Sequence, residues 1–148
     1  MQQRLQTLVT VAVLSLLAQA TGASGRSLDD RLHHLRNGDQ REWDDFPKRA
    51  ESRRLVVTFD ATANASEYTL GLRQQDVKQA WRITLNNRLL GRLVRDENDM
   101  LIYRPIPVGG LRDGKNTIVV ELTGSRPSDD IRVGELTLDD RPLKDVLG

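Results

Sequence analysis

The sequence predicts an all-β protein, an antiparallel β-sandwich of jelly-roll type with about seven to eight strands. Residues 81–85 alternate strictly between apolar and polar side chains, which is the period of a strand with one buried face. Two asparagines at 86–87 follow, and this residue type accepts positive φ and favours tight hairpin turns. A second alternating run at 116–122 follows the turn residues at 113–114. Short strands separated by turns at this spacing are typical of a sandwich.

Seven runs with strand periodicity are expected along the chain, at 55–60, 68–73, 81–86, 89–95, 100–104, 116–122 and 131–138. Pro105 and Pro107 end the fifth run, and we expect this strand at an edge or corner because proline has no amide proton for a sheet ladder. The apolar parity changes midway through the last run. Gly134 and Glu135 are therefore expected to form a β-bulge.

Residues 1–20 have the features of a cleaved signal peptide. Arg4 precedes an apolar run at 8–17, and small residues follow it; cleavage after Ala20 fits best, with Ala23 as the alternative. A membrane anchor is disfavoured because this run is far shorter than the roughly 20 apolar residues that a spanning helix needs. The protein is therefore expected to be secreted or periplasmic, with no stable membrane span after cleavage.

Residues 21–53 are expected to form a charged leader or linker in front of the sandwich. Ser27 is a candidate helix cap and Gly38 a candidate helix end, so a short helix is expected between them. The remainder is mostly charged and has too few apolar side chains to fold alone, with Trp43 and Phe46 as the groups that would dock it. The expected divisions are a signal peptide at 1–20, a leader at 21–53, a sandwich at 54–140 and a tail at 141–148.

Composition restricts the function classes. The 148 residues include 22 basic and 21 acidic ones, and this balance argues against a nucleic-acid partner, which would need a basic excess on one face. The chain has no cysteine, which excludes disulfides, zinc thiolate sites and cysteine nucleophiles. Aromatic residues make up only 4%, a poor supply for a sugar-stacking platform.

Four segments carry a resemblance to a known family. They are TFDA at 58–61, WRITLNNRLLGRL at 81–93, LRDGKNTIVVEL at 111–122 and DDIRVGELTL at 129–138. In these segments the chain resembles the galactose-binding-like jelly-roll group, which implies a sandwich whose first and last strands, 55–60 and 131–138, are neighbours. The phrases RQQDVKQAW, RDENDM and PSDDIRVGEL are similar to the N-terminal β-sandwich of larger exported bacterial proteins, some with a metallohydrolase domain of the polymerase-and-histidinol-phosphatase (PHP) type. No position here matches that domain's metal ligands or catalytic residues.

Candidate ligand-binding residues cluster after the second expected strand. Loop polar groups of this kind can orient a sugar or a partner domain. The cluster comprises Arg73, Gln74, Gln75, Asp76 and Lys78, and Tyr103 is added as an aromatic candidate. Trp43 and Tyr68 are further aromatic candidates. Trp81 shares the parity of the apolar face, so core packing is favoured over a role as a sugar platform.

The metal candidates are weak. Asp96, Glu97, Asn98 and Asp99 are hard oxygen donors in one loop, and Asp129 and Asp130 lie in another. The spacing matches no EF-hand, and a solvated acidic loop neutralised by nearby arginines (Arg92, Arg95 and Arg104) is the favoured interpretation. We therefore predict no tight calcium site. The histidine pair at 33–34 is expected to be solvated because it has no third ligand of similar type nearby.

No motif for catalysis is present. The acids cluster among other charges, and neither a Gly-x-Ser-x-Gly motif nor a glycine-rich phosphate loop occurs. We expect no enzyme and no cofactor. The leading hypothesis is an exported, non-catalytic binding or accessory module that contacts a glycan or a neighbouring protein domain. The alternatives are the detached N-terminal leader domain of a secreted metallohydrolase and a structural envelope protein.

Overall fold

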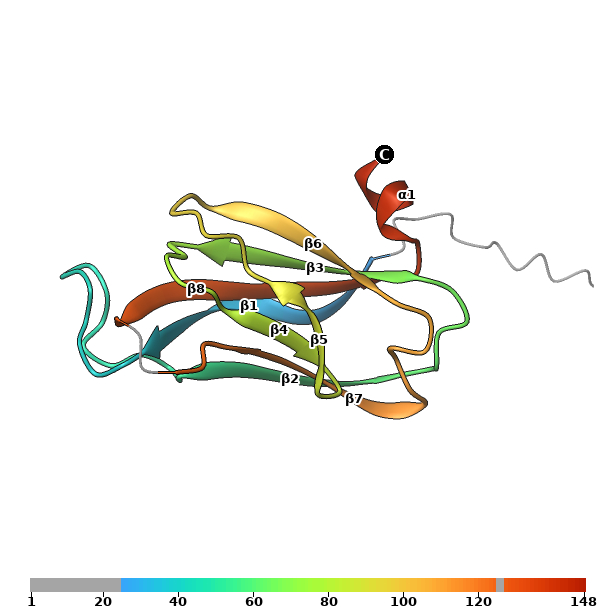
Figure 1. Ribbon diagram of the computed structural model, residues 1–148, viewed down its shortest axis with the longest axis horizontal. Helices are drawn as coiled ribbons and strands as arrows, with labels where there is room; N and C mark the ends of the chain where they lie inside the picture. Colours follow the sequence, from blue (N-terminus) through green and yellow to red (C-terminus); the bar gives the residue numbers. More distant parts are fainter. Residues whose placement is uncertain (1–24, 125–126) are drawn as a thin grey trace, which may run out of the picture.

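Two four-stranded antiparallel sheets pack face to face around a single apolar core (Figure 1). The computed structural model describes residues 25–124 and 127–148. The elements are β1 (Gly25–Asn37), β2 (Arg54–Ala61), β3 (Tyr68–Gln75), β4 (Arg82–Leu85), β5 (Arg88–Arg92), β6 (Met100–Ile106), β7 (Gly114–Glu121), β8 (Asp129–Asp139) and α1 (Leu143–Leu147). The strand order is β1-β8-β3-β6 in one sheet and β2-β7-β4-β5 in the other. The prediction of an all-β sandwich is confirmed.

The predicted signal peptide at 1–20 lies outside the described residues. Within the part of the chain that the structure describes, no helix is long and apolar enough to cross a membrane.

Alternation along the strands produces the core. The apolar residues of one parity point inward in β2, β4 and β7, and the opposite parity faces solvent or neighbouring loops. Trp81 comes directly before β4 and is fully buried, as its parity predicts. Its indole packs in the same cluster as Ile83, Leu85 and Leu93. Trp81 is therefore a core residue and offers no surface to a ligand.

The expected hairpin and bulge are confirmed. Asn86 and Asn87 adopt φ of 50° and 67° in the turn between β4 and β5, the left-handed conformation of a type I′ hairpin. Glu135 has φ of 47°, and the register of β8 against both neighbouring strands shifts beside it. Pro105 lies in β6, an edge strand, where the missing amide proton disturbs no second ladder.

The expectation of a helix after Ser27 was wrong, because this segment forms strand β1 and pairs with β8 from Gly25 to Asn37. Helical spacing of the leucines suggested an amphipathic helix, but in the strand Leu35 is buried in the core and Leu28 packs against it partly buried. Without β1, the backbone N–H and C=O groups along one side of β8 would lack their ladder partners. Among the described residues, the sandwich therefore already includes Gly25–Asn37 and does not start at residue 54.

The prediction that the strands at 55–60 and 131–138 are neighbours was also wrong. Strand β2, which covers the expected run at 55–60, lies in the sheet opposite to β8. The strand beside β8 is β1, and β1 and β2 lie next to each other across the edges of the two sheets. The true first and last described strands are thus paired, as a jelly-roll-like arrangement requires.

Residues 38–53, here called the Trp43 loop, are part of the folded domain and not a free linker. Phe46 is 4% exposed, and Ser52 forms a parallel bridge with Leu35 along the outer edge of β1. The Arg36 guanidinium donates hydrogen bonds to the carbonyl oxygens of Pro47 and Lys48, at 2.7 and 2.9 Å. Of the two aromatics expected to dock this segment, Phe46 does so and Trp43 remains exposed.

Candidate functional site

A pocket of about 280 Å³ lies where the Trp43 loop meets the end of β3 and the outer face of β8. Its lining, here called the Trp43 pocket, consists of Trp43, Asp45, Phe46, Asp76 and Arg132. In Figure 1 the Trp43 loop (teal) projects from the end of the sandwich at which β1 and β3 finish. Three segments that are distant in sequence therefore supply one concave surface.

Phe46 forms the apolar floor of this pocket. Its ring stacks on the imidazole of His34, with 5.0 Å between centroids and 22° between planes. The guanidinium of Arg132 lies 4.8 Å from the centre of the Phe46 ring. His34 and Arg132 are register partners on β1 and β8. The sheet pairing itself thus builds the seat that positions Phe46.

Trp43 forms the exposed rim, with 57% of its surface open to solvent. The Lys78 ammonium lies over the indole at 5.9 Å from the ring centroid, and it also contacts the Glu42 carboxylate at 3.3 Å. This contact restrains the indole while leaving more than half of its surface free. A restrained, exposed aromatic ring can stack against a ligand at little entropic cost.

Asp129 and Asp130 fix the base of the loops around the pocket. Both are fully buried, and Asp129 Oδ2 accepts hydrogen bonds from the amides of Lys78 and Gln79 and from the Trp81 indole N–H. Asp130 Oδ1 lies 2.7 Å from Arg36 Nε and 2.6 Å from His34 Nε2, and its Oδ2 accepts from the Glu42 amide at 2.8 Å. The two carboxylates therefore tie both loops to the start of β8.

Of the predicted ligand-binding residues, Asp76 lines this pocket and Lys78 lies beside it. Asp76 lines it and adopts φ of 58°, a conformation that aspartate tolerates better than most residues. Lys78 contacts the Trp43 ring and lines the recess formed with Arg95 and Glu97. The structure therefore brings together part of the polar cluster and one of the aromatic candidates.

Arg73 is used in a surface ion-pair network and not in the pocket. Its guanidinium donates to both oxygens of Asp99 at 2.7 and 2.6 Å, and Nη1 lies 3.3 Å from a Glu135 oxygen. These hydrogen bonds raise the pKa of Arg73 and hold the pKa of the Asp99 carboxyl below its ordinary value. A ligand would have to displace one of these carboxylates to reach the guanidinium.

Tyr103 is separate from the Trp43 pocket as well. It is the register partner of Gly71 on β3, and its ring packs against Gly71, with its nearest carbon 3.1 Å from the position that a Cβ there would occupy. The absent side chain at Gly71 thus makes room for the ring on the sheet surface. The ring packs on the middle of the β3–β6 ladder.

The acidic loop between β5 and β6 is held by protein groups. Asp96 Oδ1 accepts the Asn98 amide at 2.7 Å, the Asp96 carbonyl accepts the Val77 amide, and Asp99 is bound by Arg73. Glu97 lines a shallow surface recess together with Arg95 and Asn98. Asp129 and Asp130, the proposed additional ligands, are engaged elsewhere. The absence of a tight calcium site stays a prediction, which calorimetry with calcium against a chelator tests.

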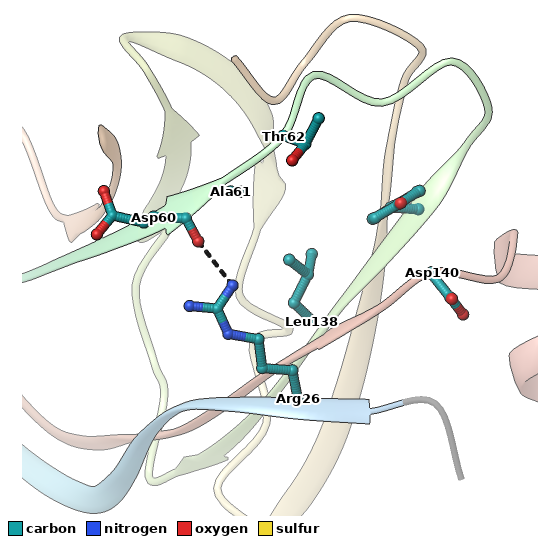
Figure 2. A pocket seen from close by; sticks show the side chains of 7 residues that line it. Arg26, Asp60, Ala61, Thr62, Leu138 and Asp140 are labelled. Atoms are coloured by element: carbon teal, nitrogen blue, oxygen red, sulfur yellow. Dashed lines mark hydrogen bonds between the residues drawn. The ribbon is translucent and has the colours of Figure 1, made fainter. Parts of the chain in front are cut away.

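A larger pocket of about 520 Å³ opens between the sheets at the other end of the sandwich. Figure 2 shows Arg26 reaching from β1 across to β2, where its Nη1 donates to the Asp60 carbonyl oxygen at 2.6 Å. The Asp60 carboxylate points away from the guanidinium, and Leu138 lies beside it. The pocket is lined by Arg26, Asp60, Ala61, Thr62, Tyr68, Leu138 and Asp140. Of these residues only Tyr68 was a candidate from the sequence.

Sequence reasoning missed Asp45 and Arg132 as pocket residues. Arg132 lies on a strand and Asp45 in a charged segment, and neither stands out among the many charges of the chain. Only the pairing of β1 with β8 and the folding back of the Trp43 loop bring them together. Comparison with known proteins adds no assignment, because no protein-family model and no curated protein matches this chain.

Proposed function

We propose that this chain is an exported, non-catalytic binding module of galactose-binding-like type that holds a glycan in the Trp43 pocket. The observation that carries the proposal is the exposed indole of Trp43 at the rim of a pocket with charged groups from three segments. Sugars bind through stacking of their C–H faces on aromatic rings and hydrogen bonds from their hydroxyl groups. The pocket supplies both kinds of group.

The polar lining suits hydroxyl groups. The carboxylates of Asp45 and Asp76 accept hydrogen bonds, and the Arg132 guanidinium donates them. The volume of about 280 Å³ lies just below the roughly 300–1,000 Å³ range of ligand pockets, which favours one terminal sugar unit over a long chain. The resemblance of the strand segments to galactose-binding-like domains supports the same ligand class.

Export is part of this proposal and rests on the signal-like residues 1–20. A protein or neighbouring-domain partner at the same surface is the competing occupant. It would use Trp43 as an apolar anchor, as buried aromatics do in protein interfaces. The two occupants differ in whether a free sugar is sufficient for binding.

The test is a glycan array probed with the full chain, with and without calcium. We expect binding to a restricted set of glycans, and a loss of affinity of about tenfold or more in Trp43→Ala. Asp76→Asn removes the charge and keeps a residue type that tolerates positive φ, so it should weaken binding without disturbing the loop.

The matched control is Leu101→Ala, which removes an equally exposed apolar side chain on β6. Its glycan binding should equal that of the parent chain. If the full chain binds no glycan, or if Trp43→Ala binds as well as the parent, the proposal is overturned.

A further inference from the structure

His33 lies between two carboxylates, and each of its ring nitrogens contacts one of them. Nε2 is 2.5 Å from Asp29 Oδ2, and Nδ1 is 2.8 Å from Glu51 Oε2. The imidazole side chain is 11% exposed. Asp29 belongs to β1, as His33 does, whereas Glu51 belongs to the Trp43 loop. The histidine therefore joins the loop to the sandwich through hydrogen bonds.

An irregularity in the pairing of β1 with β8 brings the side chain of Asp29 close to His33, four residues further along the same strand. From Ser27 to Leu32, β1 advances five residues while β8 advances only three, from Thr137 to Gly134. In a regular strand, residues 29 and 33 would be about 13 Å apart along the strand axis. The extra residues shorten β1 here, and the Asp29 carboxylate reaches the His33 ring.

Hydrogen bonds from the ring to both carboxylates at the same time need protons on both of its nitrogens. An ionised carboxylate only accepts hydrogen bonds, and a neutral imidazole has a single N–H to donate. Both contacts are satisfied only when both nitrogens of His33 carry protons. After loss of one proton, a nitrogen lone pair would face a carboxylate oxygen, and that contact becomes repulsive.

The other charged group that contacts this ring among the described residues is Arg31. Its Nη2 lies 3.3 Å from His33 Nδ1 and 3.6 Å from Glu51 Oε2. When Nδ1 is deprotonated, Arg31 can donate to it and retain a loose ion pair with Glu51. The Arg31 side chain is 64% exposed, and exposed pairs of this kind hold little structure in place.

Glu51 is adjacent to the backbone contacts that seat the loop. Its amide donates to the His34 carbonyl oxygen at 3.0 Å, and the Arg36 amide donates to the Ser52 carbonyl oxygen at 3.1 Å. On the other face of β1, His34 contacts Asp130 and stacks on Phe46, the floor of the Trp43 pocket. Both histidines of the chain thus lie under the loop that carries Trp43.

We propose that His33 is a positioning residue whose protonation fastens the Trp43 loop to β1, so that the Trp43 pocket is fully assembled at mildly acidic pH and loosens as the pH rises. The fastened loop holds one proton more than the loosened loop, so lower pH favours it. This inference rests on the proposed function only in its consequence for glycan binding at the Trp43 pocket. The pH response of the loop stands on the His33 geometry alone.

The test is NMR on the full chain without any ligand, between about pH 5 and pH 8, where histidine changes charge. Two-bond correlations in the His33 ring should show protons on both nitrogens at the acidic end. Across this range, the hydrogen-exchange protection factors of the Glu51 and Arg36 amides should fall about tenfold or more. The amide of Ile118, in the buried core of β7, should keep its protection.

Glu51→Gln is the matched variant, because a carboxamide can donate to a bare Nδ1 or accept from a protonated one. Its loop protection should no longer depend on pH, and His33→Gln should behave the same way. If protection in the parent chain is constant with pH, or if Glu51→Gln keeps the parent's pH response, the inference is overturned. Neither result depends on the glycan array, so failure of one proposal leaves the other measurable.

Discussion

At the residue scale, the two tryptophans have opposite roles, and burial decides which is which. Trp81 is fully buried and donates its indole N–H to Asp129 at 2.8 Å, whereas Trp43 is mostly exposed. The apolar parity of residues 81–85 was sufficient to place Trp81 in the core. Trp43 stands in a charged, aperiodic segment, so its sequence context could not show whether it would be covered.

Trp81→Ala is expected to lower the free energy of unfolding by about 3–5 kcal/mol, because the removed ring leaves a cavity. Trp81→Phe keeps most of the ring but removes one donor from Asp129, which is expected to cost about 1–3 kcal/mol. Urea unfolding measures both. Trp43→Ala is the control and should stay within about 1 kcal/mol of the parent. A Trp81→Ala protein as stable as the parent would contradict the core assignment.

The Arg73–Asp99 pair gives a second prediction at this scale. Because the pair lowers the pKa of Asp99 in the folded state, it stabilises the fold above the ordinary value of 3.8, and this contribution is lost as the pH falls through the lowered value. Carboxyl-detected NMR titration should find Asp99 titrating below 3.8. In Arg73→Gln the pKa of Asp99 should rise back toward its ordinary value. In the parent chain, high salt should raise it by a smaller amount because salt screens the ion pair. An unchanged Asp99 titration in Arg73→Gln would refute the pairing.

At the element scale, strand β1 shows how tertiary pairing overrides local pattern. The cap-like Ser27, the acidic residues after it and Gly38 all favour a short helix. The strand forms because β8 offers a free edge, and because Leu35 and the buried face of β1 complete the core. Neither advantage is visible within the segment itself. The other seven strands contain their own alternation and turn residues, and could be predicted for that reason.

The β1–β8 irregularity depends on Gly134. A Cβ at this position would lie only 1.8 Å from the carbonyl oxygen of Arg31, so the chain comes too close there for any side chain. Gly134→Ala is expected to cost at least about 1–3 kcal/mol, as overpacked sites do. Gly25→Ala is the control, since a Cβ there meets nothing within 4 Å. Equal melting temperatures for the two variants would show that β1 can shift at no cost.

At the scale of the whole molecule, arginines join the two sheets along both open sides. Arg26 on β1 donates to the Asp60 carbonyl oxygen of β2 on one side. On the other, Arg104 of β6 donates through Nε and Nη2 to the Arg92 carbonyl oxygen of β5, at 3.0 and 2.7 Å. Partial burial lowers the pKa of Arg104. These contacts satisfy edge carbonyls that would otherwise be available to a further strand.

Because β1 is part of the sandwich, a chain that begins at residue 50 is not expected to fold cooperatively. It would lose one of the two strands paired with β8, the core residue Leu35 and most of the Trp43 loop. Near-UV circular dichroism and a urea titration test this, and we expect weak signals and a broad transition. Removal of 143–148 is the control, because α1 has no buried residues. A sharp transition in the chain from residue 50 would show that β1 is dispensable.

The sequence by itself determined the fold class, seven of the strands, the β4–β5 hairpin, the bulge in β8 and the burial of Trp81, because each depends on alternation or turn chemistry within a few residues. Asp76 and Lys78 were also recognisable as part of a polar cluster. Only the tertiary structure decided that β1 is a strand, that β1 rather than β2 is the neighbour of β8, and that Arg73 is occupied by Asp99. It also decided that Asp45 and Arg132 share a pocket and that His33 lies between Asp29 and Glu51. These features depend on pairings between residues far apart in the chain. The free energy of such pairings comes from closing the sheets and burying their edges, and no local sequence pattern encodes that free energy.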